Sequence, residues 1–291
     1  MISDTVCAII VTFHPDREIL EHLSKLRQQM QHIVVVDNGS SPAEMDLLRV
    51  ACRDTGSHLI ENGENLGIAA ALNIGIRHAL TLGSEWVLLF DQDSCVTPGF
   101  VEAMLHGFTS SRWGKQLGVM VPQYVDKRLG SIIPPPALED TSLSVAMTSG
   151  SLIPMSILLR HGLFEEGLFI DVVDTEHSFR LRSLGYRIAR CPSAVLLHSP
   201  GTPTLHKFCG RTFSTNNYSP LRRYYQERNT IWLTKRYWKT DPTQCIRFHR
   251  DSLSNYVHIL FLEENKWEKF RACFLGVVDG VREKMGRKDD L

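Results

Sequence analysis

Short apolar blocks separated by helical patterns run through the first third of the chain. Residues 6–13 and 33–36 are near-continuous apolar runs rich in β-branched side chains, which indicate buried parallel strands. Residues 16–30 show the helical spacing of leucine and isoleucine. The pattern then repeats, with predicted helices up to about Ala51 and over 66–82, and predicted strands at 58–61 and 86–90. This alternation predicts an α/β fold with a mainly parallel, Rossmann-like sheet flanked by helices.

Beyond residue 119 the pattern is less regular. The proline run 134–136 predicts an extended surface loop, and residues 148–154 predict a strand at the centre or edge of the sheet. A helix is expected over 175–184, ended by Gly185. Residues 199–220, rich in Ser, Thr, Pro and Asn, predict a mobile loop, and helical patterns continue to residue 286. We therefore expect two parts, an α/β domain over 1–218 and a C-terminal helical region over 219–291.

Composition is ordinary for a soluble globular protein, with 43% hydrophobic and 22% charged residues. No apolar run approaches the ~20 residues that span a bilayer. The N-terminus enters a strand almost at once and shows neither the basic n-region nor the cleavage site of a secretory signal. The seven cysteines show no CxxC spacing, which favours reduced thiols. These features together predict a cytoplasmic protein.

The net charge is zero, but the charges are unevenly distributed. Residues 1–179 contain 11 Lys and Arg against 22 Asp and Glu, whereas residues 180–250 contain 14 against 2. A basic segment that follows an acidic half fits a site in which anionic phosphates are held from both sides. The alternative for the basic segment is a nucleic-acid-binding surface.

Two aspartates, Asp91 and Asp93, follow the strand predicted at 86–90 with one residue between them. Because ligands bind beyond the carboxyl ends of the strands in α/β sheets, these side chains can converge there with Asp37, which follows another strand. Carboxylate oxygens bind hard divalent ions such as Mg²⁺ or Mn²⁺. Taken alone, the aspartate pair favours the simpler interpretation, a solvated turn after a strand.

Five segments that carry such residues occur in order along the chain: Val34–Ser40, Asn65–Gly75, Leu88–Ser94, Phe169–Arg180 and Leu196–Gly201. With the later run Arg222–Thr230, they resemble the family 2 inverting glycosyltransferases of the GT-A fold, and most closely the bacterial rhamnosyltransferase branch. The resemblance covers nearly the whole chain. It implies a metal-dependent hexosyltransferase that moves L-rhamnose from a dTDP-sugar donor to a hydroxyl of a lipid-linked, O-antigen-like cell-surface polysaccharide precursor.

The resemblance also implies which residues bind the nucleotide sugar. Asp37 would contact the pyrimidine and ribose, although a turn residue is an equal interpretation of this position. Asn65 and Gly67 would border the nucleotide. The full implied set is Thr12, Asp37, Asn65, Gly67, Asn73, Asp91, Gln92 and Asp93.

The implied metal site contains Asp93 as a direct ligand of Mg²⁺ or Mn²⁺. Asp91 would bind the ribose or a water on the ion, and His198 would complete the metal shell. A structural role for a lone histidine is equally consistent with the sequence. The ion would act as a Lewis acid on the departing diphosphate.

An inverting transfer requires one base that takes the proton of the acceptor hydroxyl. The resemblance implies Asp174 as this base, with Asp171 as the alternative. Val173 stands where many relatives have an acid, a departure shared with the rhamnosyltransferase branch. Glu176 would be a second carboxylate that orients the acceptor or the base, or it would stabilise the N-terminus of its helix.

A basic and aromatic cluster is expected to hold the diphosphate of the donor or of a lipid-diphosphate-linked acceptor. Arginine forks bind phosphate oxygens in pairs, and the i,i+4 spacing puts Tyr224 with Arg228 and Tyr225 with Asn229 on shared helix faces. A solvated amphipathic face is the alternative. The expected members are Arg180, Arg222, Arg223, Tyr224, Tyr225, Arg228 and Asn229.

The C-terminal region mixes apolar and aromatic residues with Lys and Arg around 231–237, 257–262 and 270–281. This composition is compatible with peripheral contact at the inner face of the bacterial plasma membrane. A helical subdomain or a homodimer contact explains it equally.

Other functions make different demands on the sequence. A UDP- or GDP-sugar donor would require no change of fold. A sugar-1-phosphate nucleotidyltransferase would need a Gly-rich, Arg- or Lys-bearing loop that residues 11–15 lack. A nucleic-acid-binding protein that used residues 180–250 would leave the aspartates unexplained, and their charges would repel a polyanion. The intact aspartates also disfavour a catalytically inactive scaffold, so we expect an enzyme without a nucleic-acid partner.

Overall fold

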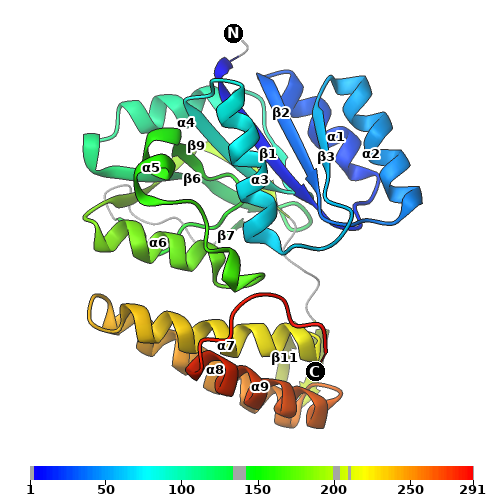
Figure 1. The fold of residues 1–291 in the computed structure, drawn as a ribbon, viewed down its shortest axis with the longest axis vertical. Helices are drawn as coiled ribbons and strands as arrows, with labels where there is room; N and C mark the ends of the chain where they lie inside the picture. Colours follow the sequence, from blue (N-terminus) through cyan, green and yellow to red (C-terminus); the bar gives the residue numbers. More distant parts are fainter. Residues whose placement is uncertain (1–2, 134–141, 199–203, 209–210, 291) are drawn as a thin grey trace.

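The structure is a computed structural model that describes residues 3–133, 142–198, 204–208 and 211–290. Within these residues, a nine-stranded sheet forms the upper body in Figure 1, and three long helices lie beneath it. The strand order is β3-β2-β1-β4-β8-β6-β9-β5, and β7 pairs with β6. The proline run 134–136 lies outside the described residues.

The N-terminal half of the sheet is parallel, as predicted. Its strands are β1 (Ser3–Thr12), β2 (Met30–Asp37), β3 (His58–Glu61) and β4 (Trp86–Asp91). The intervening helices are α1 (Glu18–Arg27), α2 (Pro42–Thr55) and α3 (Ile68–Thr81). Helix α2 runs past Ala51 to Gly56, which ends it in the left-handed conformation at φ 63°. Right-handed crossovers put α3 on the face opposite to α1 and α2, because the strand order reverses after β3.

The second half of the sheet is mixed, so the prediction of a mainly parallel sheet holds only for the first half. Strand β8 (Leu152–Pro154) runs antiparallel between β4 and β6 (Leu117–Asp126), whereas β9 (Arg187–His198) is parallel to β6. The short strands are β5 (Cys95–Val96) and β7 (Ile132–Ile133), and the helices are α4 (Phe100–Thr109), α5 (Met155–His161) and α6 (Val173–Ser183). The α/β fold class with a C-terminal helical extension is confirmed.

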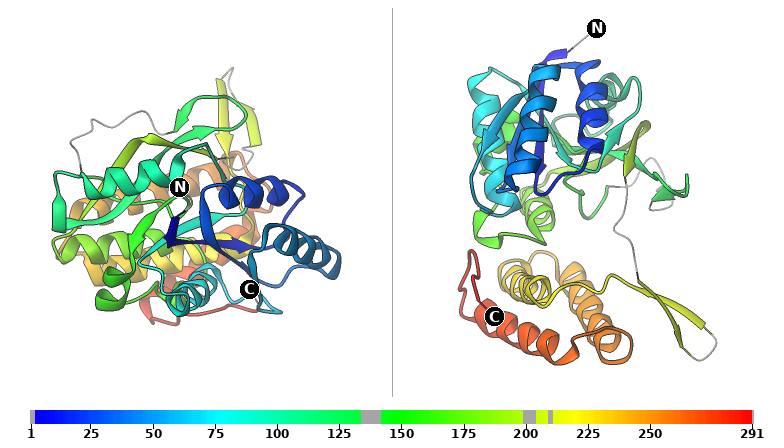
Figure 2. Two further views of the ribbon diagram at one scale, coloured as in Figure 1. Left: turned by 90° about the horizontal axis from the view of Figure 1, so that it is seen from above. Right: turned by 90° about the vertical axis from the view of Figure 1, so that its right-hand side faces the viewer.

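The segment predicted as a mobile loop contains a hairpin, β10 (Thr204–Phe208) and β11 (Arg211–Thr215). Figure 2 shows this hairpin projecting from the body, while residues 199–203 lie outside the described part. The predicted helices follow as α7 (Pro220–Tyr237), α8 (Pro242–Phe261) and α9 (Lys266–Val281). Within the described residues, no helix combines the length and apolar character that a bilayer crossing requires.

Helices α7 and α9 approach each other closely because two glycines of α9 face α7. A Cβ on Gly276 would lie 2.4 Å from the carbonyl oxygen of Tyr224, and one on Gly280 would lie 2.6 Å from that of Arg228. Any larger side chain would force the two helices apart. The pair therefore forms a tight support for the residues that α7 presents to the sheet domain.

Candidate active site

Three neighbouring parallel strands bring polar residues to one edge of the sheet. Thr12 at the end of β1 lies opposite Asp37 at the end of β2, and Asp91 at the end of β4 lies opposite Val11. Because the strands are buried along their length, their polar ends mark the edge at which α/β folds bind ligands. The structure thus brings Asp37 and Asp91 to the same edge, as the strand pattern predicts.

The carboxylate of Asp37 is fully engaged by this protein's own donors. Thr12 Oγ1 donates to Asp37 Oδ1 at 3.0 Å, and the backbone N–H groups of Gly39 and Ser40 donate to Oδ2 at 3.0 and 2.9 Å. Thr12 is completely buried and Asp37 nearly so. These contacts give both residues a turn-forming role, and contact of Asp37 with a nucleotide stays a prediction.

An asparagine network joins the end of β2 to the loop before α3. Asn38 Nδ2 donates to Asn65 Oδ1 at 3.0 Å, and Asn38 Oδ1 accepts from Asn62 Nδ2 at 3.2 Å and from the N–H of Leu66 at 3.1 Å. Gly67 is required for close packing, since a Cβ there would lie 2.6 Å from the carbonyl oxygen of Phe169. Asn65 and Gly67 therefore shape this loop.

Gln92, between the two aspartates, fastens their loop to the end of β1. Its amide exchanges two hydrogen bonds with the backbone of Phe13, at 2.8 and 3.2 Å. Ser94 and Ser149 share a hydrogen bond of 2.6 Å, and Ser149 Oγ accepts the N–H of Asp91 at 3.2 Å. The positions of Asp91 and Asp93 are therefore set by their neighbours before any ligand binds.

The aspartate pair lies in a strongly negative environment. Burial, followed by the charges of Asp93 and Asp174, raises the pKa of Asp91 to about 7. A nearby cation stabilises the ionised form of a carboxyl group that lies beside other carboxylates. The electrostatics of the site therefore favour the binding of positive charge.

Asp93 and His198, the predicted ligands of a divalent cation, lie near each other, and His198 Nδ1 also lies within hydrogen-bond distance of Ser94 Oγ, at 3.2 Å. Asp93 Oδ1 is buried without any hydrogen-bond partner, and His198 Nδ1 lies 3.7 Å from it, too far for a hydrogen bond. Adjacent ligands of an octahedral ion are separated by roughly 3 Å, so a small movement would let both bind one ion. No group of three or more acidic, histidine or cysteine side chains with metal-site geometry occurs in the described parts of the chain. Phosphate oxygens and water would have to complete the shell.

Asp174 lies in the first turn of α6, close enough to Asp91 for its charge to act on that carboxyl group. Its Oδ1 accepts the N–H of Thr175 at 2.7 Å. Burial raises the pKa of Asp174 to about 6. The hydrogen bonds from Thr175 lower this pKa, and the charge of Asp171 raises it. Asp171 in turn accepts two hydrogen bonds from Arg222, at 3.1 and 3.2 Å. A carboxylate with a pKa near neutrality is suited to general base catalysis.

Glu176 and Arg180 do not join these acids. Tyr237 donates to Glu176 Oε1 at 2.7 Å, and Arg180 donates to Glu176 Oε2 at 3.1 Å and to the carbonyl oxygens of His161 and Leu163. Glu176 is only 1% exposed. Its bonded partners connect α6 to α7. The expected role of Glu176 in orienting the acceptor or the base stays a prediction. Asn73 is likewise buried, and its amide bonds the backbone of Phe164, while contact of Asn73 with a nucleotide stays a prediction.

Most of the predicted diphosphate cluster is buried in contacts of its own. Arg223 pairs with Glu263 at 2.6 Å, Tyr224 donates to Asp279 at 2.8 Å, and the Tyr225 hydroxyl accepts the N–H of Lys288. Arg228 and Asn229 donate to backbone carbonyls. These internal contacts disfavour phosphate binding by the five residues, whose role at a diphosphate stays a prediction. Arg222 alone is half-exposed and near the acids.

Part of the positive charge of the basic segment 180–250 is paired with acids. Five of its basic residues form ion pairs: Arg180 with Glu176, Arg182 with Asp241, Arg222 with Asp171, Arg223 with Glu263 and Lys235 with Glu283. This pairing disfavours the nucleic-acid alternative.

Ser94, Ser149 and Tyr124 are site residues that the sequence interpretation missed. The serines position the aspartate loop. Tyr124 lies close enough to Asp91 and Asp174 for their charges, after burial, to raise the pKa of its hydroxyl. Ser94 directly follows Asp93, which was a usable signal. Nothing in the local sequence distinguishes Ser149 or Tyr124.

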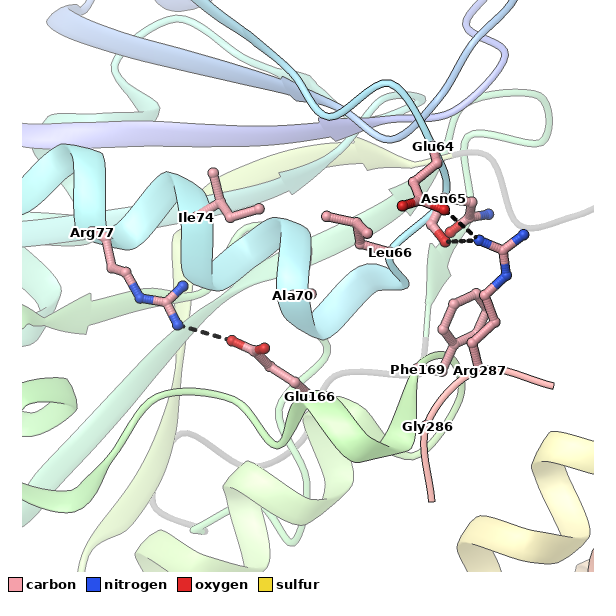
Figure 3. A pocket seen from close by; sticks show the side chains of 10 residues that line it. All are labelled: Glu64, Asn65, Leu66, Ala70, Ile74, Arg77, Glu166, Phe169, Gly286 and Arg287. Carbon is pink, nitrogen blue, oxygen red and sulfur yellow. Dashed lines mark hydrogen bonds and ion pairs between the residues drawn. The ribbon is translucent and has the colours of Figure 1, made fainter. Parts of the chain in front are cut away.

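Two pockets adjoin the site. Figure 3 shows one of about 510 Å³ beside the β3–α3 loop, where Asn65, Phe169 and the ion pairs Arg77–Glu166 and Arg287–Glu64 form its wall. The other, of about 470 Å³, lies between the sheet and α8. It is lined by Tyr124, Met147, Thr175, Gln244, Phe248 and Asp251, so it reaches the residue next to Asp174.

Comparisons with known proteins agree with this geometry. The sequence model described as Glycosyl transferase family 2 matches residues 7–112. The chain is 29% identical to the dTDP-rhamnosyl transferase RfbF of Shigella flexneri over 96% of both chains, and 26% identical to the galactofuranosyltransferase GlfT1 of Mycobacterium tuberculosis over 78% of this chain and 81% of that one. The mannosyltransferase PcManGT of Pyrobaculum calidifontis, solved with GDP-Man and Mn²⁺, shares the fold with a TM-score of 0.59 at 15% identity, covering 96% of this chain and 88% of that one.

Proposed function

We propose that the chain is a family 2 glycosyltransferase of the GT-A fold and that it acts as an inverting, metal-dependent rhamnosyltransferase. The donor would be dTDP-L-rhamnose and the acceptor a hydroxyl of a lipid-diphosphate-linked polysaccharide precursor. The observation that carries the proposal is the proximity of Asp174 in α6 to Asp91 at the end of β4, whose carboxyl group feels the charges of both Asp93 and Asp174. The similarity to RfbF across the length of both chains supports the choice of donor.

In this reaction Asp174 acts as the general base. Its carboxylate takes the proton of the acceptor hydroxyl while the acceptor oxygen forms a bond to the anomeric carbon. The bond from that carbon to the diphosphate oxygen breaks, and the diphosphate leaves with the bonding electrons. The proton ends on Asp174 and the anomeric configuration inverts. A pKa of about 6 leaves Asp174 ionised at neutral pH while keeping it basic enough for this step.

Asp93 and His198 would hold Mg²⁺ or Mn²⁺, and Asp91 would face the ion or the ribose. When bound, the cation supplies positive charge that stabilises the leaving diphosphate. Arg222, half-exposed beside Asp171, is the remaining member of the predicted cluster that has access to a diphosphate.

We propose that the acceptor saccharide occupies the pocket between the sheet and α8. Phe248 and Tyr124 offer aromatic surface, and Gln244 and Asp251 offer polar groups for sugar hydroxyls. Thr175 lines the same pocket and adjoins Asp174 in sequence. Helices α7–α9 would then form the acceptor-side region, which supports a division near residue 219.

Exposed apolar residues on α8 and α9 support peripheral contact with a membrane that carries the lipid-linked acceptor. The side chains of Leu253, Phe261, Trp267 and Phe274 are 59–81% exposed. Several large apolar side chains exposed on neighbouring helices are typical of a surface that contacts a membrane or another protein. Co-sedimentation with vesicles of phosphatidylglycerol and phosphatidylethanolamine should fall several-fold in the double variant Trp267→Ser/Phe274→Ser. Unchanged vesicle binding together with a loss of self-association in that variant would indicate a homodimer contact instead.

The donor is tested by a thermal-shift screen of dTDP-, UDP- and GDP-sugars with Mg²⁺ or Mn²⁺. The largest increase in Tm is expected for dTDP-L-rhamnose with a metal, and Asp93→Ala should remove the part of that increase that depends on the metal. A larger increase with a UDP- or GDP-sugar would keep the glycosyltransferase assignment and replace the donor. No response to any nucleotide would count against the proposal.

A further inference from the structure

We propose that Arg228 and Asn229 of α7 are positioning residues that hold the segment Gly167–Val172 in a strained conformation and thereby fix the place of Asp174. The inference rests on the proposed role of Asp174 as the base. It gives the C-terminal helices a part in catalysis that requires no contact with substrate.

The segment before α6 is strained at three non-glycine residues. Phe169, Asp171 and Val172 have φ values of 64°, 61° and 65°. Left-handed backbone is uncommon for any residue with a Cβ, and it is strongly disfavoured for a β-branched residue such as Val172. Such conformations persist only where the surrounding structure over-determines them, and they concentrate at functional sites.

Asn229 holds the carbonyl groups of this segment. It is completely buried, and its Nδ2 lies 3.0 Å from Leu168 O, 2.8 Å from Ile170 O and 3.0 Å from Asp171 O. A single side chain therefore bonds three carbonyls of a strained turn. Because an amide carries only two N–H donors, the third contact is shared.

Arg228 holds the start of the same segment. Its Nη2 donates to Gly167 O at 3.0 Å and to Leu168 O at 2.9 Å, and its Nε donates to Asn229 Oδ1 at 2.9 Å. The side chain is 1% exposed. Because Asn229 Oδ1 accepts a hydrogen bond from Arg228, the side-chain amide of Asn229 is oriented with its N–H groups toward the segment Gly167–Val172.

The opposite side of the segment is held by α3. The N–H of Ile68 donates to Phe169 O at 2.7 Å, and the Phe169 ring stacks on Tyr225 with centroids 5.0 Å apart. Figure 3 shows Phe169 against the end of the β3–α3 loop, beside Arg287. The strained turn is thus clamped between the donor-side loop and α7.

The segment that Arg228 and Asn229 hold leads directly into the first turn of α6, where Asp174 lies. Asp171 carries the last bonded carbonyl, and its side chain is paired with Arg222 on the same helix α7. Val172 O accepts the N–H of Glu176 in the first turn of α6, and Asp174 lies in that turn. If the segment relaxed, the start of α6 would shift, and a displacement of about 1 Å can reduce a rate by about 100-fold.

The test compares the full-length protein with Asn229→Ser, which shortens the side chain and removes its N–H donors. We would measure dTDP affinity, dTDP release from dTDP-L-rhamnose with Mn²⁺ and a panel of octyl glycosides, and amide hydrogen exchange over residues 167–176. The positioning role predicts dTDP affinity and donor KM within about twofold of the unmodified protein, faster exchange, and a kcat lower by roughly 10- to 100-fold.

Thr234→Val is the matched control on the same helix. It removes a hydroxyl that bonds Thr230 O and His249 away from the segment, and it should leave kcat and the exchange of 167–176 unchanged. A kcat for Asn229→Ser equal to that of the unmodified protein, or an equal loss in the control, would overturn the proposal. If Asn229→Ser does not fold, Arg222→Gln replaces it as the test, because it removes the ion pair between the half-exposed Arg222 and Asp171. An unchanged kcat in Arg222→Gln would also contradict the proposal. Inactivity of the unmodified protein with every donor would instead count against the proposed function.

Discussion

Asp91 at the end of β4 and Asp174 in the first turn of α6 lie within electrostatic reach of each other: after burial and the charge of Asp93, the charge of Asp174 also raises the pKa of Asp91. Asp91 belongs to the edge that would receive the diphosphate, and Asp174 to the helix that approaches it from the C-terminal half.

Asp174→Asn is expected to abolish transfer while donor binding is retained. The amide keeps the size of the side chain and its contact with Thr175, but it cannot accept the proton of the acceptor hydroxyl. General base catalysis contributes about 10²- to 10⁴-fold, so kcat should fall within that range, with dTDP affinity within about threefold. Retained transfer would move the role of base to Asp171.

The acid limb of the pH–rate profile should report the ionisation of Asp174. Its pKa of about 6 means that the base is protonated below that pH and ionised above it. The rate should therefore rise with pH through about 6. Asp171→Asn removes a charge that raises the pKa of Asp174, so the acid limb should move to lower pH. Arg222→Gln removes the positive charge that pairs with Asp171, so the pKa of Asp174 should rise and the acid limb should move to higher pH. Shifts in the same direction for both variants would contradict this account.

The N-terminal strands could be predicted because each is a buried apolar run between clear turn signals. Strand β6 could not, since its buried apolar residues are interrupted by Pro122 and Gln123. Strand β8 has only three residues, too few for any periodicity. The hairpin at 204–215 is rich in Ser and Thr and resembles a loop in composition.

The aspartates of the site were predictable from topology, because the ends of parallel strands meet at one edge. The residues of α7 were not. Helical spacing shows which of them share a face, but not whether that face meets solvent or another part of the chain. The partners of Arg223 and Arg228 are Glu263 and the carbonyls of Gly167 and Leu168, each 40 or more residues away.

Asp93→Ala should make nucleotide affinity independent of metal. Asp93 Oδ1 has no partner within the protein, so its removal costs little in folding but deletes a ligand. His198→Ala should weaken metal-dependent binding of dTDP by roughly 10- to 100-fold. Titration of dTDP with Mn²⁺ or with EDTA measures both effects, and His161→Ala, a histidine of α5, serves as the control. Equal responses to Mn²⁺ in all three variants would exclude Asp93 and His198 as ligands.

Asp91→Asn should inactivate the enzyme and yet stabilise the metal-free protein at alkaline pH. The pKa of Asp91 is raised from 3.8 to about 7 in the folded state, so the folded protein binds this proton more tightly than the unfolded chain does. The resulting stability is present below pH 4 and is lost as the pH rises through about 7. A shift of about three units corresponds to at most about 4 kcal/mol. In EDTA, Asp91→Asn should therefore have a higher Tm than the unmodified protein at pH 8, with a smaller difference at pH 5. Added Mn²⁺ should narrow the gap at pH 8, because a bound cation stabilises the ionised aspartates of the unmodified protein. A difference in Tm that is equal at both pH values would show that Asp91 does not carry this unfavourable charge.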